Sequence, residues 1–391
     1  MASPFYLFEF EQNVRNTVGL YIHNIQPGDK TKGDFHFILK RIISMNQQIL
    51  KQVVGIDVSQ KELVVCFGRM TDALCPQLCS HASFANTPAG MQKLVSWAVK
   101  QKQADRPLRF VMEATGVYHE SLAYFLSGQG HPLSIVLPNK ISNYVRTLET
   151  RTVTDKTAAQ AITLFGLERQ LSDWQPPRPE LRKLRQLTRE REQLVATRTM
   201  VKNQLHAEKA GAMPSEETIS RMKKHVVFLN QQITQIQQSI TTLVRQQEEL
   251  KTSLALCCSV PGVGQLTAAI VLAETNGFEL IRNKKQLVSF AGLDVREKQS
   301  GTSVRGKPRI SKKGNRFLRK AMHMPALGAI RSDERLKGVF SRLVAKHGIK
   351  MKAVVAVQRK VLELIYTVYK TQRPYDHQYH KKLESSTTTT L

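Results

Sequence analysis

The hydrophobic pattern changes period several times along the chain, and each change marks an expected element. Residues 53–60 (VVGIDVSQ) and 62–69 (ELVVCFGR) are β-rich runs joined by a short polar turn, which predicts two strands, and 81–87 can form a third. Helical and strand spacing then alternate, in the order helix 88–101, strand 108–115, helix 117–130, strand 133–139 and a helix near 139–149. Strands that alternate with helices indicate an α/β domain around a largely central sheet.

Residues 180–252 have a different pattern. The runs 180–211 and 215–250 carry apolar residues at steps of three and four among Lys, Arg, Glu and Gln, and a break with Gly and Pro separates them. This predicts two long antiparallel helices that form a coiled-coil arm. Because the glutamine-rich stretch 230–238 makes a weak core, we expect the arm to pair with another surface. Self-association is the first interpretation, and solvated helices are the alternative.

The remaining residues predict a second globular part. Residues 258–274 (CSVPGVGQLTAAIVLAE) have a turn–Pro–Gly–x–Gly–helix pattern that resembles a helix–hairpin–helix, whose glycine turn exposes backbone N–H groups to a phosphate. Within 281–320, thirteen Lys or Arg stand against two acids. One helix over 324–345 and another near 350–371 are expected to complete this part.

Charge narrows the class of partner. The 391 residues include 58 Lys and Arg against 31 Asp and Glu, a formal net charge of +27. Such a charge indicates a large polyanion and favours nucleic acid, because neutralised phosphates release counterions. An anionic membrane is the weaker alternative, since no basic amphipathic helix with an aromatic face stands out. No apolar run reaches the length of about 18 residues that a transmembrane helix needs.

The first residues and the cysteines point to the cytoplasm. The chain begins without the basic start and apolar run of a secretory signal. Its five cysteines are odd in number and irregularly spaced, which disfavours a disulfide framework. Cys75 and Cys79 lack a second pair at zinc-finger spacing, so a zinc site is also disfavoured. We therefore expect a reducing, cytoplasmic location.

Three carboxylates lie where the elements of the first domain begin or end. Asp57 lies in the first strand, Glu113 ends the apolar part of its strand, and Asp155 begins a helix. Acids in such places can converge on one or two magnesium ions, which offsets the cost of burying unpaired carboxylates. Each acid has a plainer alternative: a turn residue for Asp57, an ion pair with arginine for Glu113, and a helix cap for Asp155.

The segment 297–315 (EKQSGTSVRGKPRISKKGN) places glycines and small residues between cations, and we interpret it as a flexible, phosphate-facing loop. A serine hydroxyl in such a field can attack a phosphodiester when another group accepts its proton, and Ser300 and Ser303 are the candidates. The alternative is a hydroxyl that only hydrogen-bonds phosphate. The cations expected to bind nucleic acid are Arg305, Lys307, Arg309, Lys312, Lys313 and Arg316.

Five motifs stand in the order of a known family: VGIDVSQKELVV, VMEATGVYHESLAYFL, VTDKTAAQAI, PGVGQLTAAIVLAE and SFAGLDVREKQSGTSVRGKPRISKKGNRFLRKAMHMPA. Together with the long helices between them, they resemble the DEDD insertion-sequence transposases of family one hundred and ten, the bridge-RNA-guided recombinases. The resemblance covers roughly residues 53–375. It implies an α/β RNase-H-like (RuvC-like) domain, followed by the antiparallel coiled-coil helices and a mostly α-helical C-terminal domain with the helix–hairpin–helix-like element.

The resemblance assigns Asp57, Glu113 and Asp155 as the first three of the family's four acids, with Mg²⁺ as the cofactor. The fourth acid belongs three residues after Asp155, where this chain has Ala158. Three residues make about one helical turn, so the missing carboxylate would project beside Asp155. Either the copy is naturally degenerate or an aspartate was replaced deliberately, and the matching neighbours favour replacement. In both cases we expect strand cleavage to be weak or absent.

The family's nucleophilic serine falls on Ser300, which implies a covalent 5′-phosphoserine link to DNA. It also implies a composite site, in which the acids of one subunit meet the serine of another, in a dimer or tetramer. The first hypothesis is therefore a recombinase that excises and inserts its own element, with double-stranded donor and target DNA chosen by a structured non-coding bridge RNA. The alternatives are a Holliday-junction-type nuclease with water as the nucleophile, and a catalytically dead nucleic-acid-binding protein.

These interpretations divide the chain into five segments. We expect an N-terminal extension of unassigned role, a RuvC-like metal-binding domain, a coiled-coil arm, a C-terminal transposase domain that carries the serine, and a disordered tail. Their expected ranges are 1–50, 51–178, 179–252, 253–375 and 376–391, in that order. The expected location is the cytoplasm of a bacterium or archaeon, in association with the nucleoid.

Overall fold

The structure is a computed structural model of the chain. It describes residues 48–103, 106–114, 116–148, 152, 154–279, 281–297, 299–300, 304–306 and 308–378, without the side chains of 299, 300, 304 and 305. Nearly all of the expected N-terminal extension and most of the expected tail therefore lie outside the described residues. The chain divides into two compact units between Pro176 and Pro177.

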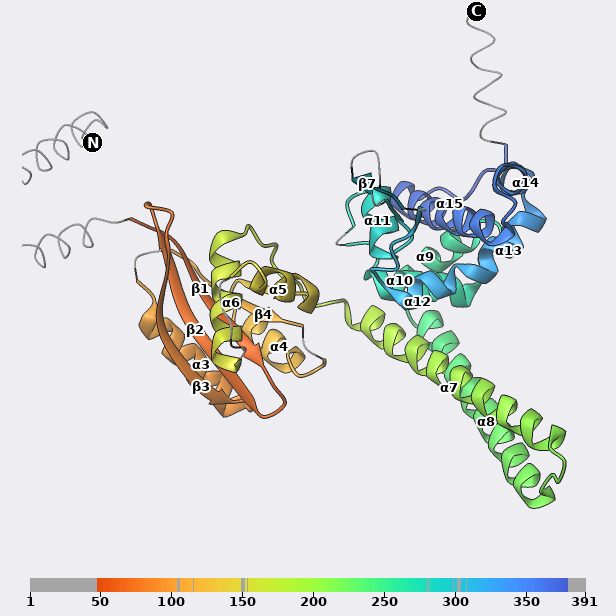
Figure 1. Cartoon of the computed structure of the whole chain (residues 1–391), viewed down its shortest axis with the longest axis horizontal. Coiled ribbons are helices and arrows are strands. Elements are labelled where there is room, and N and C mark those ends of the chain that lie inside the picture. The colour runs from red at the N-terminus through yellow and green to blue at the C-terminus, as the bar shows by residue number, and fades with distance from the viewer. Residues whose placement is uncertain are drawn as a thin grey trace, which may run out of the picture. The chain divides into compact units, whose positions relative to one another are not determined.

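The first unit is built on a five-stranded sheet in the order β3-β2-β1-β4-β5 (Figure 1). The central strand β1 pairs antiparallel with β2 and parallel with β4; β2 pairs antiparallel with β3, and β4 parallel with β5. This mixed topology confirms the RuvC-like α/β fold class. The strands are Ile49–Val58 (β1), Glu62–Thr71 (β2), Pro76–Ala85 (β3), Leu108–Glu113 (β4) and Leu133–Val136 (β5).

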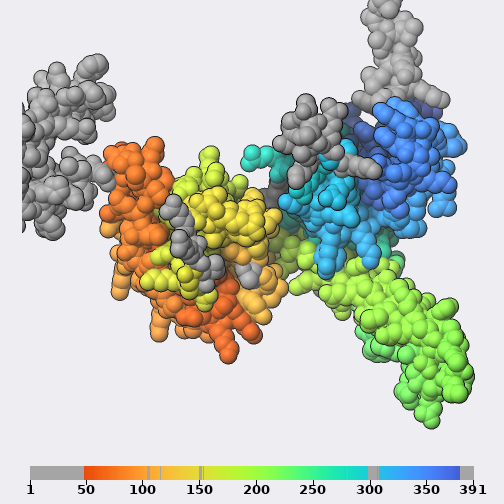
Figure 2. Space-filling view, in the orientation of Figure 1, coloured from red at the N-terminus to blue at the C-terminus, as the bar shows by residue number. Residues whose placement is uncertain are grey.

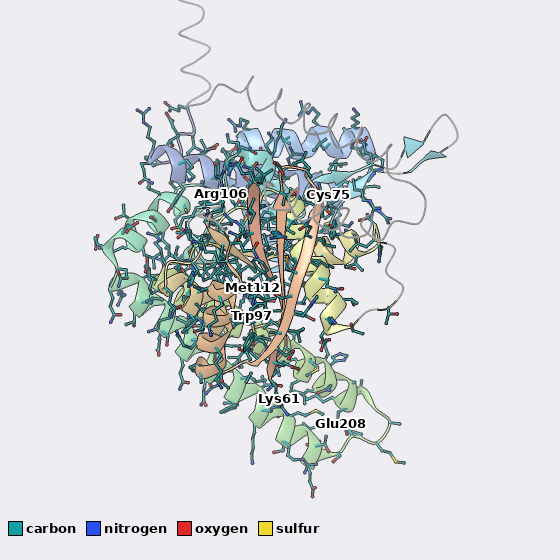
Figure 3. All side chains as sticks on the ribbon, turned by 90° about the vertical axis from the view of Figure 1, so that its left-hand side faces the viewer. Lys61, Cys75, Trp97, Arg106, Met112 and Glu208 are labelled. Atoms are coloured by element: carbon teal, nitrogen blue, oxygen red, sulfur yellow. The ribbon has the colours of Figure 1, made fainter. Side chains whose placement is uncertain are left out.

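Helices cover both faces of this sheet, as the alternation of side chains along β1 requires. Val54 and Ile56 are fully buried in one cluster with residues of α3 and α4. Val53 points the other way and joins a smaller cluster with residues of α5 and α6. Figure 3 marks the two ends of the sheet: Lys61 lies in the β1–β2 turn, and Cys75 precedes β3. The helices are Pro88–Gln101 (α3), Glu120–Gly128 (α4), Pro138–Val145 (α5) and Asp155–Glu168 (α6).

Helix α6 packs unusually close to the sheet because β1 has a glycine beneath it. A Cβ atom at Gly55 would lie 2.4 Å from the backbone nitrogen of Thr163 and 2.8 Å from the carbonyl oxygen of Ala159. The buried Thr163 hydroxyl also donates to the carbonyl oxygen of Cys66 on β2 at 2.9 Å. These contacts set the height and the rotation of α6 over β1 and β2.

Replacing Gly55 with alanine is expected to lower the free energy of unfolding of the first unit by about 2 kcal/mol, since the added methyl meets helix backbone that cannot swing aside. Chemical denaturation followed by far-UV circular dichroism measures the change. Gly128→Ala is the matched control, because nothing lies within 4 Å of its Cβ position in α4. Equal stability of the two variants would contradict the close packing of α6.

The second unit contains a helical arm and a helical body. Helices α7 (Pro179–Ala210) and α8 (Glu216–Arg245) pack along each other as the antiparallel arm, which projects from the body (Figure 2). The buried positions of α8 follow steps of four and three, the spacing of a coiled-coil seam: Leu229, Ile233, Ile236, Ile240 and Leu243. The interpretation of the glutamine-rich stretch as a weak core is wrong, because Gln231, Gln235 and Gln238 are exposed and isoleucines form the seam.

One face of α15 is buried in the body: Val357, Val361 and Ile365 have no exposed surface. One continuous core joins α15 to the other body helices and to the base of the arm. None of the helices in the described part of the chain is long and apolar enough to cross a membrane. The body helices are Glu248–Cys258 (α9), Gln265–Thr275 (α10), Lys284–Phe290 (α11), Arg316–Ala321 (α12), His323–Ser332 (α13), Glu334–His347 (α14) and Lys350–Thr371 (α15).

One expectation for the body needs correction. The single helix expected over 324–345 is two helices, because Asp333 is extended and its carboxylate accepts the Leu336 N–H at 2.9 Å, which begins α14 anew. The glycine turn between α9 and α10 is also packed against α13. Gly262 has a φ of +79°, and a Cβ there would lie 2.3 Å from the carbonyl oxygen of Pro325, so this close approach requires glycine.

Candidate functional site

Asp57 and Glu113 lie side by side at one edge of the sheet. Ile56 of β1 pairs with Met112 of the parallel strand β4, and each acid is the next residue along its strand. Parallel strands end at the same edge, so the two carboxylates project from neighbouring positions on one face. Both side chains are half-buried. The register therefore brings together two acids that lie 56 positions apart in the chain.

Asp155 completes this group from the helix above the sheet. Gly55 of β1 contacts the carbonyl region of Ala159, and two residues along the strand Asp57 points to the same face. Asp155 lies four residues, about one turn, before Ala159 on the same side of α6. The close packing of α6 thus places the first residue of the helix over the strand position that carries Asp57.

The cap of α6 is Thr154 rather than Asp155. The Thr154 hydroxyl accepts the backbone N–H of Thr157 at 3.2 Å, and the Thr157 hydroxyl accepts the Thr154 N–H at 2.8 Å. This reciprocal pair is a capping box, which satisfies the exposed donors of the first turn. The alternative that Asp155 serves only as a helix cap is therefore wrong, and its exposed carboxylate is available for another role.

The proximity of the three acids changes the pKa of Asp57. The pKa of Asp57 rises from 3.8 to about 6, first because burial disfavours its charged form, and then because the negative charges of Asp155 and Glu113 repel it. A backbone hydrogen bond at Val58 opposes this shift. Three carboxylates that repel one another are destabilising unless a cation joins them.

Position 158 faces the same space as Glu113. A cleft of about 530 Å³ beside the sheet edge is lined by Glu113, Thr157, Ala158 and Ala161, and by residues of α5. Ala158 is half-buried there, one turn along α6 from Asp155. A longer side chain at this position would extend into the cleft. The tertiary structure therefore places this alanine in the same cleft as Glu113, one turn along α6 from Asp155.

The three carboxylates are of the chemical kind that binds a hard divalent cation. Carboxylate oxygens are the ligands that Mg²⁺ prefers. Among the described residues, no three His, Cys, Asp or Glu side chains already lie close enough to hold an ion. The convergence of the acids and the raised pKa of Asp57 fit a site that a cation would draw together.

The raised pKa of Asp57 predicts a pH-dependent stability in the absence of metal. The folded state keeps the proton up to about pH 6, while the unfolded state releases it near 3.8. Stability contributed by this group is therefore lost as the pH rises through that window and stays low above it. We expect Asp57→Asn to raise the Tm of the metal-free protein at pH 7 and to leave it unchanged at pH 3.5. A Tm difference that is the same at both pH values would contradict the assignment.

Ser300 belongs to a β-hairpin rather than to the irregular loop expected from the sequence. Val295 pairs with Ile310 in one antiparallel ladder, and Ser300 pairs with Val304 in a second, nearer the tip. Apolar β-branched residues at paired positions explain the strand preference. Ser300 is the last described residue before Val304. Residues 301–303, with Ser303, lie outside the described residues, as does the Ser300 side chain.

The basic residues of this region extend along the returning strand and into α12. Arg309, Lys312, Lys313 and Arg316 are exposed, and no described residue pairs with the first three side chains. The Arg316 guanidinium lies 4.9 Å from the ring centre of Phe317. Lys307 and the side chain of Arg305 lie outside the described residues. Unpaired cations on a hairpin and the following helix form a surface suited to a phosphate backbone.

Sequence reasoning missed Arg146, which follows α5. It lines the cleft of Glu113 and Ala158, and it is the cation among the described residues that does so. A guanidinium there can hold a phosphate oxygen opposite the acids. Nothing in the sequence around Arg146 distinguishes it from the other Lys and Arg residues, of which the chain has 58 in all. Its place after α5, beside the strand that carries Glu113, is what marks it as a candidate.

Two family models match the chain in the order of its units. Residues 54–210, which include all three acids, match the DEDD transposase model of IS110, described as a transposase. Residues 254–340 match the model described as the transposase IS116/IS110/IS902 family. They include the serine hairpin, which is the hairpin that carries Ser300 and whose outer ladder pairs Val295 with Ile310. The chain belongs to the IS110 family of DEDD transposases. An IS110-family transposase acts on DNA, and enzymes of the DEDD type use a divalent metal.

Curated relatives resemble this IS110-family transposase over most of its length. The pilin gene-inverting protein of Moraxella bovis is 28% identical over 332 residues, which cover 85% of this chain and 99% of that protein. The transposase for insertion sequence element IS1111A of Coxiella burnetii is 24% identical over 68% of this chain and 78% of its own. The solved Thermus thermophilus RuvC in complex with Holliday junction substrate aligns with 29% of this chain and 90% of its own, at 14% identity and a TM-score of 0.23.

Proposed function

We propose that this IS110-family transposase is a DNA recombinase that cuts and rejoins donor and target DNA under the guidance of a structured non-coding bridge RNA. The observation that carries the proposal is the convergence of Asp57, Glu113 and Asp155 at one sheet edge, with Ala158 in the place of a fourth acid. Choice of DNA by base pairing to an RNA suits a protein with a strong, diffuse positive charge, because such a protein recognises the shape and the phosphate backbone of the nucleic acid rather than its bases. Its site of action would be the nucleoid in the cytoplasm.

The three acids are the proposed ligands of Mg²⁺. A divalent cation bound there supplies a positive charge that stabilises negative charge developing on a phosphate oxygen. Arg146, which lines the same cleft, would hold the same phosphate. With Ala158 present, we propose that the cation is held weakly and that the protein as it stands binds DNA but cleaves it poorly.

Ser300 is the proposed nucleophile. Its Oγ would form a bond to the phosphorus while the bond from phosphorus to the 3′-oxygen breaks, which leaves a 5′-phosphoserine and a free 3′-hydroxyl. The serine proton passes to a base, and the departing oxygen takes up a proton. The exposed cations of the hairpin and α12, among them Arg309, Lys312 and Lys313, would hold the adjoining phosphates.

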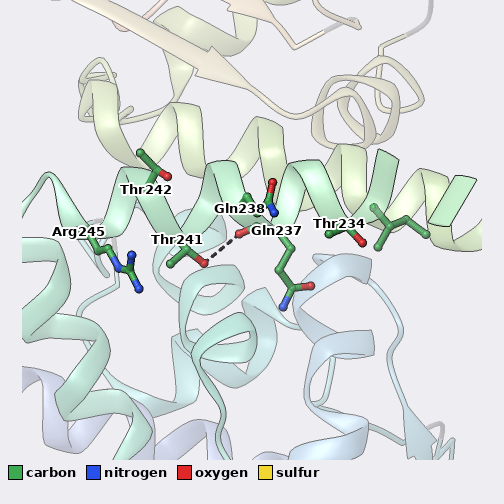
Figure 4. Close-up of a pocket in the computed structure, with 7 residues that line it drawn as sticks. Thr234, Gln237, Gln238, Thr241, Thr242 and Arg245 are labelled. Atoms are coloured by element: carbon green, nitrogen blue, oxygen red, sulfur yellow. Dashed lines mark hydrogen bonds between the residues drawn. The ribbon is translucent and has the colours of Figure 1, made fainter. Parts of the chain in front are cut away.

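A composite site requires more than one subunit, and the arm is the proposed contact. Its helix α8 exposes apolar side chains toward the tip, where Val227 and Phe228 keep 56% and 54% of their surface exposed. Nearer the base, Thr234, Gln238 and Arg245 line a shallow groove along α8 (Figure 4). Exposed apolar and amide side chains on a long helix support self-association as a dimer or tetramer.

The RNA part of the proposal is tested by purifying the full chain from cells that carry the complete element and sequencing the RNA that co-purifies. We expect one non-coding species with stable secondary structure to be enriched over the total RNA of the same cells. Recovery of each RNA species in proportion to its cellular abundance would contradict guidance by a bridge RNA. The DNA-binding and acidic-site assignments would survive that outcome, since they rest on different residues.

A further inference from the structure

Glu274 is a buried acid in the second unit, held by two other elements. Its side chain on α10 is 1% exposed. Arg189 of the arm helix α7 donates to it through a fork, from Nε to Oε1 at 2.7 Å and from Nη2 to Oε2 at 2.8 Å. The Nδ2 of Asn315 donates to the same Oε2 at 2.6 Å. Charge-assisted hydrogen bonds from both sides determine the orientation of this carboxylate.

Asn315 closes the base of the serine hairpin. The chain leaves this base at Asp294 and returns at Ser311, whose N–H donates to the Asp294 carbonyl oxygen at 2.8 Å. Four residues later the Asn315 N–H donates to the Phe290 carbonyl oxygen at 2.7 Å. Its Oδ1 accepts the Leu318 N–H at 3.0 Å, which begins α12. Asn315 thus joins three elements: its Nδ2 bonds Glu274, its Oδ1 bonds the start of α12, and its backbone N–H bonds the hairpin base.

We propose that Glu274 is a positioning residue of the transposase, which fixes the serine hairpin to the arm by holding Asn315 on one side and Arg189 on the other. The inference rests on the proposed function, because the arm is the proposed subunit contact and the hairpin carries the proposed nucleophile. A serine that must reach the acids of another subunit needs a hairpin that keeps its angle to the arm. A displacement of about 1 Å can cost roughly a hundredfold in rate.

A second contact between α7 and α12 provides an internal control. Lys320 of α12 pairs with Glu192 of α7, but their side chains are 67% and 29% exposed. An exposed pair of this kind contributes little to stability and does not touch the hairpin base. If any link between the arm and α12 were sufficient, Glu192→Gln would have the same effect as a change at Glu274. We expect it to have none.

The test exchanges donor and acceptor at the 2.6 Å contact between Asn315 and Glu274. Asn315→Asp keeps the helix cap but places two carboxylates against each other. Adding Glu274→Gln restores a donor and an acceptor with the roles reversed. The new amide nitrogen, in the place of Oε2, donates to the new carboxylate and gives up the hydrogen bond from Arg189 Nη2, while the amide oxygen, in the place of Oε1, still accepts from Arg189 Nε. Each variant is made in the full chain as it stands and, for rates, in the Ala158→Asp background.

Hydrogen exchange of the full chain reports the position of the hairpin base. We expect Asn315→Asp to speed exchange of the amides in the first turn of α12 and in the β6–β9 ladder (Val295–Arg296 and Arg309–Ile310) by roughly tenfold, without a change in α15. In the Ala158→Asp background, the maximal rate of covalent DNA capture should fall by roughly tenfold or more while the DNA concentration at half-saturation stays constant. The double variant should recover both quantities to within about threefold.

The outcomes separate this inference from the proposed function. If Asn315→Asp lowers the Tm but leaves local exchange and the maximal rate unchanged, Glu274 acts in stability alone and the positioning role is overturned. The role is also overturned if the double variant recovers neither quantity. If the Ala158→Asp parent captures no DNA, the phosphoserine mechanism fails, and the exchange measurement still decides whether Glu274 holds the hairpin.

Discussion

Replacing Ala158 with aspartate is expected to raise the rate of magnesium-dependent DNA cleavage by about a hundredfold or more. The new carboxylate would enter the cleft that Glu113 lines, one turn along α6 from Asp155. A fourth oxygen ligand converts a repelling group of three acids into a set that can hold a divalent cation, and such a cation contributes several kcal/mol to phosphoryl chemistry. The measurement is a time course of strand cleavage with and without Mg²⁺.

The matched control is Ala158→Asn, which adds nearly the same volume without the charge. It should remain as inactive as the parent chain. Thermal stability provides a second measurement. Added Mg²⁺ should raise the Tm of the Ala158→Asp protein more than that of the parent, because the ion binds only the folded state. If aspartate and asparagine give the same activity and the same Tm response, the acidic group is not a metal site.

Removal of the Ser300 hydroxyl in the Ala158→Asp background is expected to abolish the covalent protein–DNA complex, a loss of at least about a thousandfold. The argument is chemical, because alanine has no atom that can bond to phosphorus, and a removed nucleophile is not replaced by its neighbours. The assay is the retention of labelled DNA on the denatured protein. Binding of DNA to the folded protein should change little, since the cations of the hairpin and α12 remain.

Ser303→Ala is the control for this experiment, since it removes a hydroxyl three residues further along the sequence. Its adduct yield should stay within about threefold of the parent. A Ser300→Ala protein that still cuts DNA and leaves free ends would favour water as the nucleophile, and with it a Holliday-junction-type nuclease. Loss of the adduct in Ser303→Ala alone would move the nucleophile to that residue.

Local pattern predicted most elements of this protein but failed at specific boundaries. The helix predicted over 88–101 matches α3, and the one predicted near 350–371 matches α15, since each has uninterrupted helical spacing. The third strand begins at Pro76 rather than at residue 81, because its first half is polar and relies on pairing with β2. The expected helix over 324–345 divides at Asp333, whose carboxylate also accepts the Tyr375 hydroxyl at 2.8 Å. That contact spans 42 positions, which local periodicity does not register.

The sequence by itself determined the fold class, the coiled-coil arm, the basic character and the candidate acids. Periodicity, net charge and motif order depend only on which residues occur and in what order. Only the tertiary structure decided that these acids meet. Their convergence depends on the register that aligns Ile56 with Met112 and on the approach of α6 over Gly55. The same holds for the fork of Arg189 on Glu274 across 85 positions. Register and helix height are set by long-range packing, which no local pattern encodes.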